Sequence, residues 1–446
     1  MASEIVEHYL SDFAELSANG SSALPNWLVE IRKNAADRFA EVGFPSSRDE
    51  KWRFTNFSPI VDKAFAANKG PESCSSSPKL LDEELGWSSD VRVVFVNGEF
   101  SPDLSQLGTL PHGAIVGNLA SVLHDNPPVL ENHLARTADS SDSPFTALNT
   151  AFLAEGGVLY LPDGICVEEP IQFLYLTNDD QRDTVSHPRN LVVLGEGAEA
   201  TVVESYVGLG NTRLWTNPVT EIVLGDSANL KTHRVQLESK STFHTATTQC
   251  HQGRDSNFAF STVEFGGSLS RHDISFQLNG AGASCSLHGL SHLRERQHAD
   301  NHTTIEHAKP HCTSIENFTG IFDDSSHGVF TGRVLVQPDA QKTDAIQSSR
   351  NLLLTDKARA DTQPQLEIYA DDVKCTHGAT VGPIDEEALF YLRSKGLSAE
   401  EARTMLTYGF AVEIIDTIEI MGLRDRLDVL LRSRLQGDGR DTREEK

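Results

Sequence analysis

The chain has 446 residues, of which 38% are hydrophobic and 23% are charged, and its formal net charge is −26. This composition is that of a soluble globular protein with a large core, and it excludes a disordered chain. An acidic chain of this size lacks the basic surfaces that nucleic acids and anionic membranes require, so we expect neither as a partner.

No apolar run follows Met1, and no stretch approaches the ~20 apolar residues that a transmembrane helix needs. We therefore expect neither a signal peptide nor a membrane span. The six cysteines are scattered and form no C-x-x-C pair, which in a chain of this length indicates reduced thiols. Together these features predict a cytoplasmic protein.

The first part of the chain, residues 1–149, is predicted to be helical and mixed. Apolar residues recur at helical spacing between Pro25 and Gly43, where a helix is expected. The span 71–79 is rich in Ser and Pro and predicts a mobile loop. An apolar strand is expected at 91–96, closed by the strong turn signal Asn97-Gly98.

The middle of the chain, residues 150–383, is predicted to be a long β region, because β-branched and alternating runs return without helical periodicity. A short run of one form recurs there, with glycines at intervals of 30, 28 and 27 residues (Gly195, Gly225, Gly253 and Gly280). Such a period is typical of solenoids, and strands separated by turns at this spacing fit the coils of a β-helix. A β-sandwich with turns at chance spacing stays open as the alternative.

The last part, residues 384–435, is predicted to be helical. Ser398 and Glu401 form a capping-box pattern, and Gly396 before them is typical of a helix C-terminus. The helix that follows carries more apolar surface than a terminal appendage can bury on itself, so we expect it to seek a partner. The polar tail 436–446 is predicted to be disordered.

Two groups of residues can bind metals. Seven histidines fall between His288 and His327, which suggests a metal site, with Cys312 beside His311 as its best candidate pair. We favour the alternative that these histidines are polar residues on the faces and turns of β coils, since no carboxylate stands at a recognised spacing.

Cys375 and His377 are different, because residues two apart on a strand lie on one face. The pair suggests a metal or sulfur-handling site, or a nucleophile with its base. The alternative is a buried cysteine beside a surface histidine. Two ligands alone do not complete a metal site, and no phosphate-binding glycine loop occurs in the chain, so it is not an ATPase of that class.

A family resemblance rests on residues 337–396. The form Cys-Thr-His-Gly-Ala-Thr-Val-Gly at 375–382, with the run 385–396 after it, closely resembles the SufB/SufD family of the SUF iron–sulfur cluster assembly machinery, and within it the SufD branch. Gly43-Phe44-Pro45, followed by Arg48, Glu50 and Trp52, is similar too. The resemblance covers nearly the whole chain and is strongest from 320 to 409.

The resemblance implies a right-handed parallel β-helix flanked by N-terminal and C-terminal helical regions. It implies a scaffold subunit, not an enzyme, in a complex with a SufB chain and two copies of the SufC ATPase. SufB would pair through the β-helix cores, and the helices of 384–435 would dock SufC. A homodimer is plausible when SufB is absent.

The resemblance also implies which residues form the site. His377 matches the histidine that the family contributes to nascent cluster assembly at the SufB–SufD interface, and Cys375 is a thiol beside it. The expected cofactor is a transient iron–sulfur cluster or iron at that interface, with a role in iron entry and none stably bound by the isolated chain. The alternatives are a β-helix carbohydrate-active lyase or hydrolase, and an autonomous metal-binding protein that uses the histidine-rich span.

Overall fold

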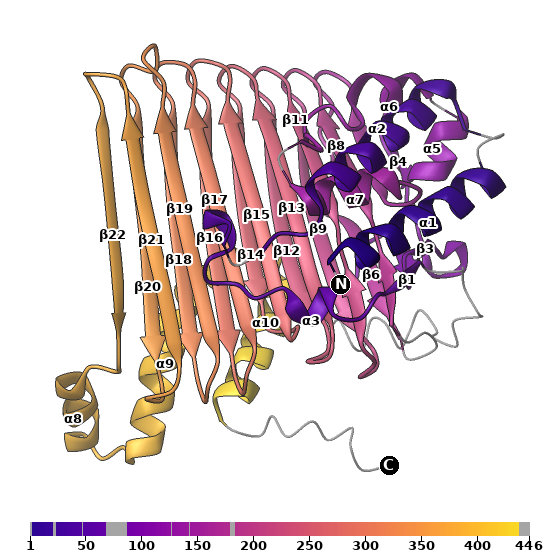
Figure 1. Ribbon diagram of the computed structural model, residues 1–446. Helices are drawn as coiled ribbons and strands as arrows, with labels where there is room; N and C mark the ends of the chain where they lie inside the picture. Colours follow the sequence, from indigo (N-terminus) through magenta and orange to yellow (C-terminus); the bar gives the residue numbers. More distant parts are fainter. Residues whose placement is uncertain are drawn as a thin grey trace.

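The centre of the molecule is a parallel β-helix in which successive strands alternate between two sheets (Figure 1). The computed structural model describes residues 2–20, 24–46, 48–67, 87–125, 127–141, 143–178 and 183–436. Within the β-helix each strand pairs in parallel with the strand of the next coil, in continuous register. The predicted β-helix is therefore confirmed, and the β-sandwich alternative is wrong because antiparallel hairpins do not build these sheets.

Sheet A holds one strand of each coil, in the order β5 (Gly157–Leu161), β8 (Arg189–Leu194), β11 (Val219–Leu224), β13 (Phe243–Gln252), β15 (Leu269–Leu278), β17 (His298–His307), β19 (His327–Val336) and β21 (Arg359–Ile368). Sheet B holds the other strand, in the order β6 (Ile171–Thr177), β9 (Glu199–Gly208), β12 (Asn229–Leu237), β14 (Asn257–Glu264), β16 (Ser284–Leu293), β18 (Thr313–Phe322), β20 (Asp344–Leu353) and β22 (Lys374–Gly382). Short strands β1 (Ala66–Ala67), β7 (Thr184–Ser186) and β10 (Leu214–Thr216) join sheet A beside this path.

The repeated glycines lie in the turns that lead from sheet A to sheet B. A Cβ at Gly253 would stand 2.8 Å from the carbonyl carbon of Gly225, and one at Gly280 would stand 2.0 Å from the amide nitrogen of Arg254. No side-chain carbon fits at such distances from backbone atoms. The repeat in the sequence thus arises because stacked turns place backbone directly against backbone.

The N-terminal region closes the first end of the β-helix. Strand β2 (Val91–Val96) extends sheet B in parallel with β6, and β4 (Ile115–Asn118) extends sheet A in antiparallel pairing with β5. The predicted strand at 91–96 and the turn at Asn97-Gly98 are confirmed, since both turn residues have positive φ and β2 pairs back with β3 (Glu99–Phe100). The loop predicted at 71–79 lies outside the described residues.

Helices of this region cover the outer face of sheet A over the early coils (Figure 1). An aromatic cluster joins them to the sheet around Trp215, whose ring meets those of Tyr9, Phe44 and Phe145. The helical elements are α1 (Ala2–Gly20), α2 (Asn26–Val42), η2 (Glu50–Trp52), α3 (Ser58–Val61), η3 (Pro102–Leu104), α5 (Leu119–Asp125), α6 (Pro127–His133) and α7 (Pro144–Ala151).

A buried carboxylate anchors a loop of the same region. Glu221 in β11 accepts hydrogen bonds from the backbone N–H groups of residues 135–138, at 2.7 to 3.0 Å. It also pairs with the buried Arg189 at 2.7 Å. Because the carboxylate satisfies so many donors at once, its burial is tolerated and the loop has one position on the sheet.

The C-terminal helices lie behind sheet B in Figure 1, on the side away from the N-terminal layer. They are α8 (Glu386–Ser394), α9 (Ala399–Ile415) and α10 (Met421–Leu435). The predicted capping box is confirmed, with Ser398 and Glu401 satisfying each other's backbone N–H groups. Ile414 and Leu427 are among the residues that pack onto the outer face of sheet B, whereas the tail beyond 436 falls outside the described residues. Across the described ranges, no helix combines the length and the apolar character that crossing a bilayer requires.

Candidate functional site at the open end of the β-helix

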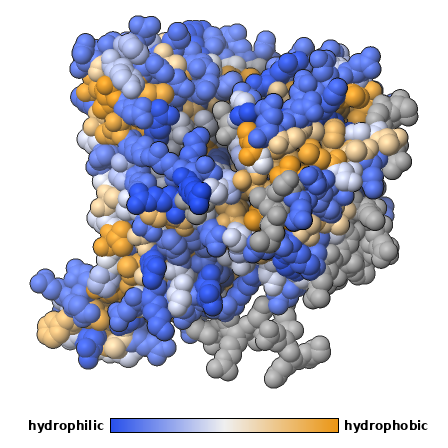
Figure 2. All heavy atoms as spheres, in the orientation of Figure 1, coloured by the Kyte–Doolittle hydropathy of each residue, from blue (hydrophilic) through white to orange (hydrophobic). Residues whose placement is uncertain are grey.

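The second end of the β-helix is formed by β21 and β22, which are the last strands of sheet A and sheet B. No strand within the described ranges pairs with their outer edges. Apolar surface appears along the left margin of the molecule in Figure 2. Ile368 on β21 and Val381 on β22 are 40% and 44% exposed. An open edge of this kind is a template for another chain.

Cys375 and His377 lie on β22 at this open end. In the sheet register Cys375 stands beside Ala345 and His377 stands beside Gln347 of β20. Ala345 and Gln347 are buried inside the β-helix, at 1% and 2% exposure. The two residues therefore share one face, as their spacing predicted, and they continue the interior of the β-helix at the point where it opens.

The thiol of Cys375 is half-buried and packs against a small apolar cluster that includes Val336 and Ala345. Burial raises the pKa of this thiol, and the nearby carboxylate of Asp344 raises it further. The neutral thiol is therefore the form present near pH 7, and it is a weaker metal ligand than a thiolate. His377 is exposed, so its imidazole is the more accessible of the two groups.

A polar column continues inward from His377. Behind it in register lie Gln347 on β20 and then Glu316 on β18, which is fully buried. The amide Nε2 of Gln347 donates a hydrogen bond to Glu316 Oε2 at 2.6 Å. Burial raises the pKa of the Glu316 carboxyl from its ordinary value of 4.5 to about 7.

Sequence reasoning missed this column. In the sequence, the column is marked only by a polar residue, Glu316, within a predicted strand of the β-helix. The next residue, Asn317, is polar as well, so polarity does not distinguish the two faces of that strand. Alternation separates two faces of a strand but does not say which of two polar faces is the inner one.

Cys375 and His377 are side chains of types that bind metals, and two ligands alone do not complete a metal site. Among the residues that the structure describes, no group of three or more His, Cys, Asp or Glu side chains is placed to hold a metal ion.

The histidine-rich span is spread over β16, β17, β19 and a turn, and among its described histidines only His298 and His327, on the neighbouring strands β17 and β19, bring their rings together, with centroids 4.8 Å apart. His298 is hydrogen-bonded to Thr55 Oγ1 at 2.8 Å, and His307 to Ser314 Oγ at 2.9 Å. Burial lowers the pKa of both imidazoles to about 4, so they are neutral near pH 7. His298 and His307 serve as hydrogen-bonding residues at the two ends of β17, in keeping with the alternative favoured above.

His311 and Cys312, the pair singled out within that span, point to different places. His311 is exposed in a turn with φ 62°, whereas Cys312 is fully buried and its thiol donates to the carbonyl oxygen of Gly280 at 3.3 Å. The structure does not bring their side chains together as a ligand pair.

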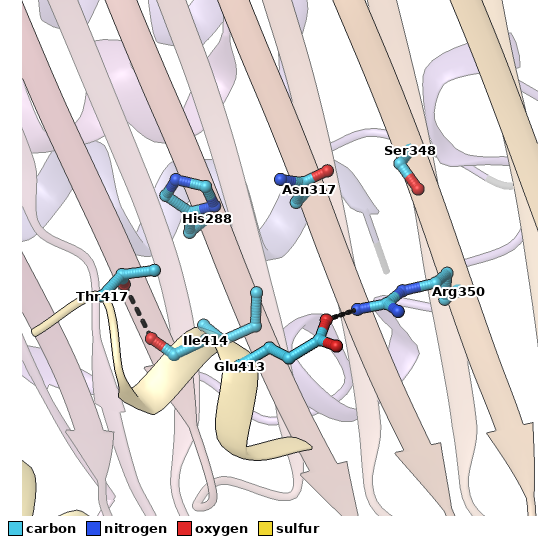
Figure 3. A pocket seen from close by; sticks show the side chains of 7 residues that line it. All are labelled: His288, Asn317, Ser348, Arg350, Glu413, Ile414 and Thr417. Carbon is cyan, nitrogen blue, oxygen red and sulfur yellow. Dashed lines mark hydrogen bonds and ion pairs between the residues drawn. The ribbon is translucent and has the colours of Figure 1, made fainter. Parts of the chain in front are cut away.

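A cavity of about 360 Å³ lies elsewhere, between α9 and the outer face of sheet B (Figure 3). His288, Asn317 and Ser348 stand in one row across neighbouring strands on its floor. Arg350 pairs with Glu413 of α9 at its side. This cavity faces away from Cys375 and His377, because it lies on the outer face of the sheet and they lie on the inner one.

Exposed aromatic side chains mark a second surface, on α8. Phe390 is 73% exposed and Tyr391 is 59% exposed. Phe390 lines a shallow hollow between α8 and the start of α9 together with Arg393 and Leu397. Large apolar groups at such exposure indicate a binding surface.

Comparisons with known proteins show the family to which the chain belongs. A family model described as "SUF system FeS cluster assembly, SufBD core domain" matches residues 175–410, and one described as "SufBD protein N-terminal region" matches residues 3–173. The first match contains the β-helix from β7 to β22, all of α8 and the larger part of α9, and it ends before α10.

Curated relatives match over most of their length. An iron–sulfur cluster assembly SufBD family protein of Synechocystis is 35% identical over 409 residues, which is 90% of this chain and 89% of the relative. The iron–sulfur cluster assembly protein SufD of Escherichia coli is 30% identical over 434 residues, 95% of this chain and 99% of the relative. Protein ABCI7 of the Arabidopsis thaliana chloroplast is 32% identical over 420 residues, 92% of this chain and 86% of the relative. The family matches replace the carbohydrate-active alternative, and the chain belongs to the SufBD family of iron–sulfur cluster assembly proteins.

Proposed function

We propose that this chain is a non-enzymatic scaffold subunit of a SUF complex, which pairs with a SufB chain through its open end and docks the SufC ATPase through residues 384–435. The observation that carries the proposal is the half-site on β22, where Cys375 and His377 face out of an unpaired end of the β-helix. In this account His377 is a ligand to iron or to a nascent cluster, and Cys375 is a thiol beside it.

The chemistry of the cargo favours a shared site. A cluster held by the imidazole of His377, with or without the thiolate of Cys375, needs its remaining ligands from the partner chain. A site divided between two chains opens when the interface changes, and a donor of clusters has to release them. The exposed imidazole of His377 also suits the entry of iron at this interface, since imidazole binds iron well.

The C-terminal helices supply the docking surface for the ATPase. Phe390 and Tyr391 on α8 and Met405 on α9 are large side chains that are more than half exposed. ATP binding and hydrolysis in SufC change the SufB interface only if SufC contacts the two states of the complex differently. The contact of α9 with sheet B provides a path by which movement of the helices reaches the β-helix.

The proposal also covers the oligomeric state of the chain without SufB and its location in the cell. Without SufB, the open end of one copy pairs with that of a second copy, which gives a homodimer. The described cysteines are all free thiols, which fits a cytoplasmic site of action.

The cluster assignment is tested with the full complex of this chain, SufB and SufC. We expect His377→Ala to assemble normally and to lower the yield of cluster several-fold, measured by absorbance and by bound iron and sulfide. Thr376→Ala is the matched control, because Thr376 is exposed on the other face of the same strand. An unchanged yield in His377→Ala would refute the assignment.

The docking assignment is tested by pull-down. We expect deletion of residues 384–435, and the double change Phe390→Ala with Tyr391→Ala, to remove SufC binding. The double variant should keep SufB, because the β-helix end is untouched. Ile346→Ala, which changes an exposed apolar residue on the outer face of β20, is the control for general loss of apolar surface. Retained SufC binding by the deletion variant would contradict the proposal.

A further inference from the structure

The polar column behind His377 contains an oxygen with no partner. Gln347 Oε1 is buried and accepts no hydrogen bond from any residue that the structure describes, although the Nε2 of the same amide donates to Glu316. A buried carbonyl oxygen without a partner costs free energy, about 1–3 kcal/mol in typical cases. An unsatisfied buried polar group in a native fold requires an explanation, and one explanation is a hydrogen-bond donor that reaches it in the functional complex.

Glu316 decides which end of the Gln347 amide faces inward. Gln347 Nε2 donates to Glu316 Oε2 at 2.6 Å, and above the Glu316 pKa of about 7 the ionised carboxylate can only accept, which keeps Nε2 turned toward it. Oε1 is thereby directed away from Glu316, and the next residue in the column on that side is His377. Neighbouring strands stand about 4.8 Å apart, which is within reach of a glutamine and an imidazole on the same face.

The opposite sheet leaves room for this arrangement. A Cβ at Gly332 on β19 would stand 2.4 Å from Gln347 Nε2 and 2.9 Å from its Cδ. The absence of a side chain at Gly332 is therefore what allows the amide to lie across the interior. The amide is held on one side by Glu316 and on another by the backbone of β19, so its orientation is restricted.

We propose that Gln347 is a positioning residue for His377: its Oε1 accepts a hydrogen bond from one ring N–H, so that the lone pair of the other ring nitrogen faces out of the open end. The exposed side chain of His377 rotates onto Oε1 to form this bond. Histidines that bind metals commonly donate their second N–H to a carbonyl or carboxylate, which fixes the tautomer and raises the affinity. This inference rests on the proposed role of His377 as a ligand.

The test is ¹⁵N NMR of the ring nitrogens in the full chain labelled at histidine, at a pH where the imidazole is neutral. The His377 signals are assigned by their absence in His377→Ala. We expect one ring nitrogen of His377 in the N–H range and the other in the lone-pair range. In Gln347→Leu we expect both shifts to move toward intermediate values, because the two tautomers then exchange.

Gln365→Leu is the matched control, since Gln365 is exposed on the outer face of β21. Glu316→Gln keeps the shape of the column and lets the Gln347 amide flip, so we expect a partial change of the same kind. Because Glu316→Gln is the milder change, it keeps the test valid if the Gln347→Leu protein unfolds. His377 shifts that are identical in the wild type, Gln347→Leu and Glu316→Gln would overturn the inference.

A second measurement separates this inference from the proposed function. In the full complex, Gln347→Leu should lower the affinity for iron or cluster by about 10-fold, the lower range for loss of such a hydrogen bond. If His377→Ala lowers the cluster yield while the ¹⁵N shifts of His377 are the same in the wild type and in Gln347→Leu, the positioning role fails and the proposed function stands. If the shifts respond to Gln347 while His377→Ala leaves cluster yield unchanged, the hydrogen bond stands and the ligand role fails.

Discussion

The two ends of the β-helix are built in opposite ways. At the first end, β2 and β4 extend the sheets, and an aromatic cluster around Trp215 seals the helical layer to sheet A. At the second end, no described strand pairs with the outer edges of β21 and β22, and side chains such as Val381 are exposed. The same solenoid is therefore covered by its own chain at one end, whereas its last strands are open at the other among the described residues.

The difference shows where stability and function reside. Buried aromatic surface stabilises the closed end, whereas an unprotected strand edge contributes little and invites association. The two open edges also differ from each other, because β21 carries Pro364, which has no N–H to offer a new strand. Strand β22 contains no proline, so continuation of sheet B is the less obstructed route for a partner.

The largest effect on the free energy of unfolding is expected for a substitution at the closed end. Trp215→Ala should lower the free energy of unfolding by about 3–5 kcal/mol, because Trp215 is 1% exposed and its indole also donates to Thr245. Denaturant unfolding monitored by circular dichroism measures the loss. Tyr391→Ala, an exposed aromatic on α8, is the control, with an expected change below about 0.5 kcal/mol. Equal losses in both variants would remove the contrast between the ends.

An intermediate effect is expected in the column behind the open end. The Glu316 pKa is about 7 in the fold and 4.5 ordinarily, so between these values unfolding releases a proton and stability falls as pH rises. Glu316→Gln has no carboxyl group, so its unfolding releases no proton at this position. Relative to the variant, the wild type should lose about 3 kcal/mol of unfolding free energy between about pH 5 and about pH 8. Parallel pH profiles for the two proteins would show that Glu316 titrates normally.

The smallest effect on stability is expected at the open edge. Val381→Ser should change the unfolding free energy by less than about 0.5 kcal/mol, because the side chain is 44% exposed. The same change should weaken association with SufB, measured by analytical ultracentrifugation. A large loss of stability without a change in association would mean that the edge is a structural element of this chain alone.

Much of this arrangement was predictable from local signals. The glycine repeat predicted the coils because stacked turns exclude a Cβ, and Cys375 and His377 were placed on one face by the two-residue period of a strand. The column of Glu316 and Gln347 was not predictable, because neighbouring polar residues give no sign of which face is inside. The positions of the histidines relative to one another were not predictable either, because they depend on which strands become neighbours in the two sheets.

The most direct test of the open end is hydrogen–deuterium exchange of this chain alone and bound to SufB. The account predicts that, in the monomeric free chain at low concentration, those amides of β22 (residues 374–382) that face away from β20 exchange rapidly, and that they become strongly protected in the complex, while the amides of β5 at the closed end do not change. Unchanged exchange in β22 upon SufB binding, with new protection elsewhere, would contradict it.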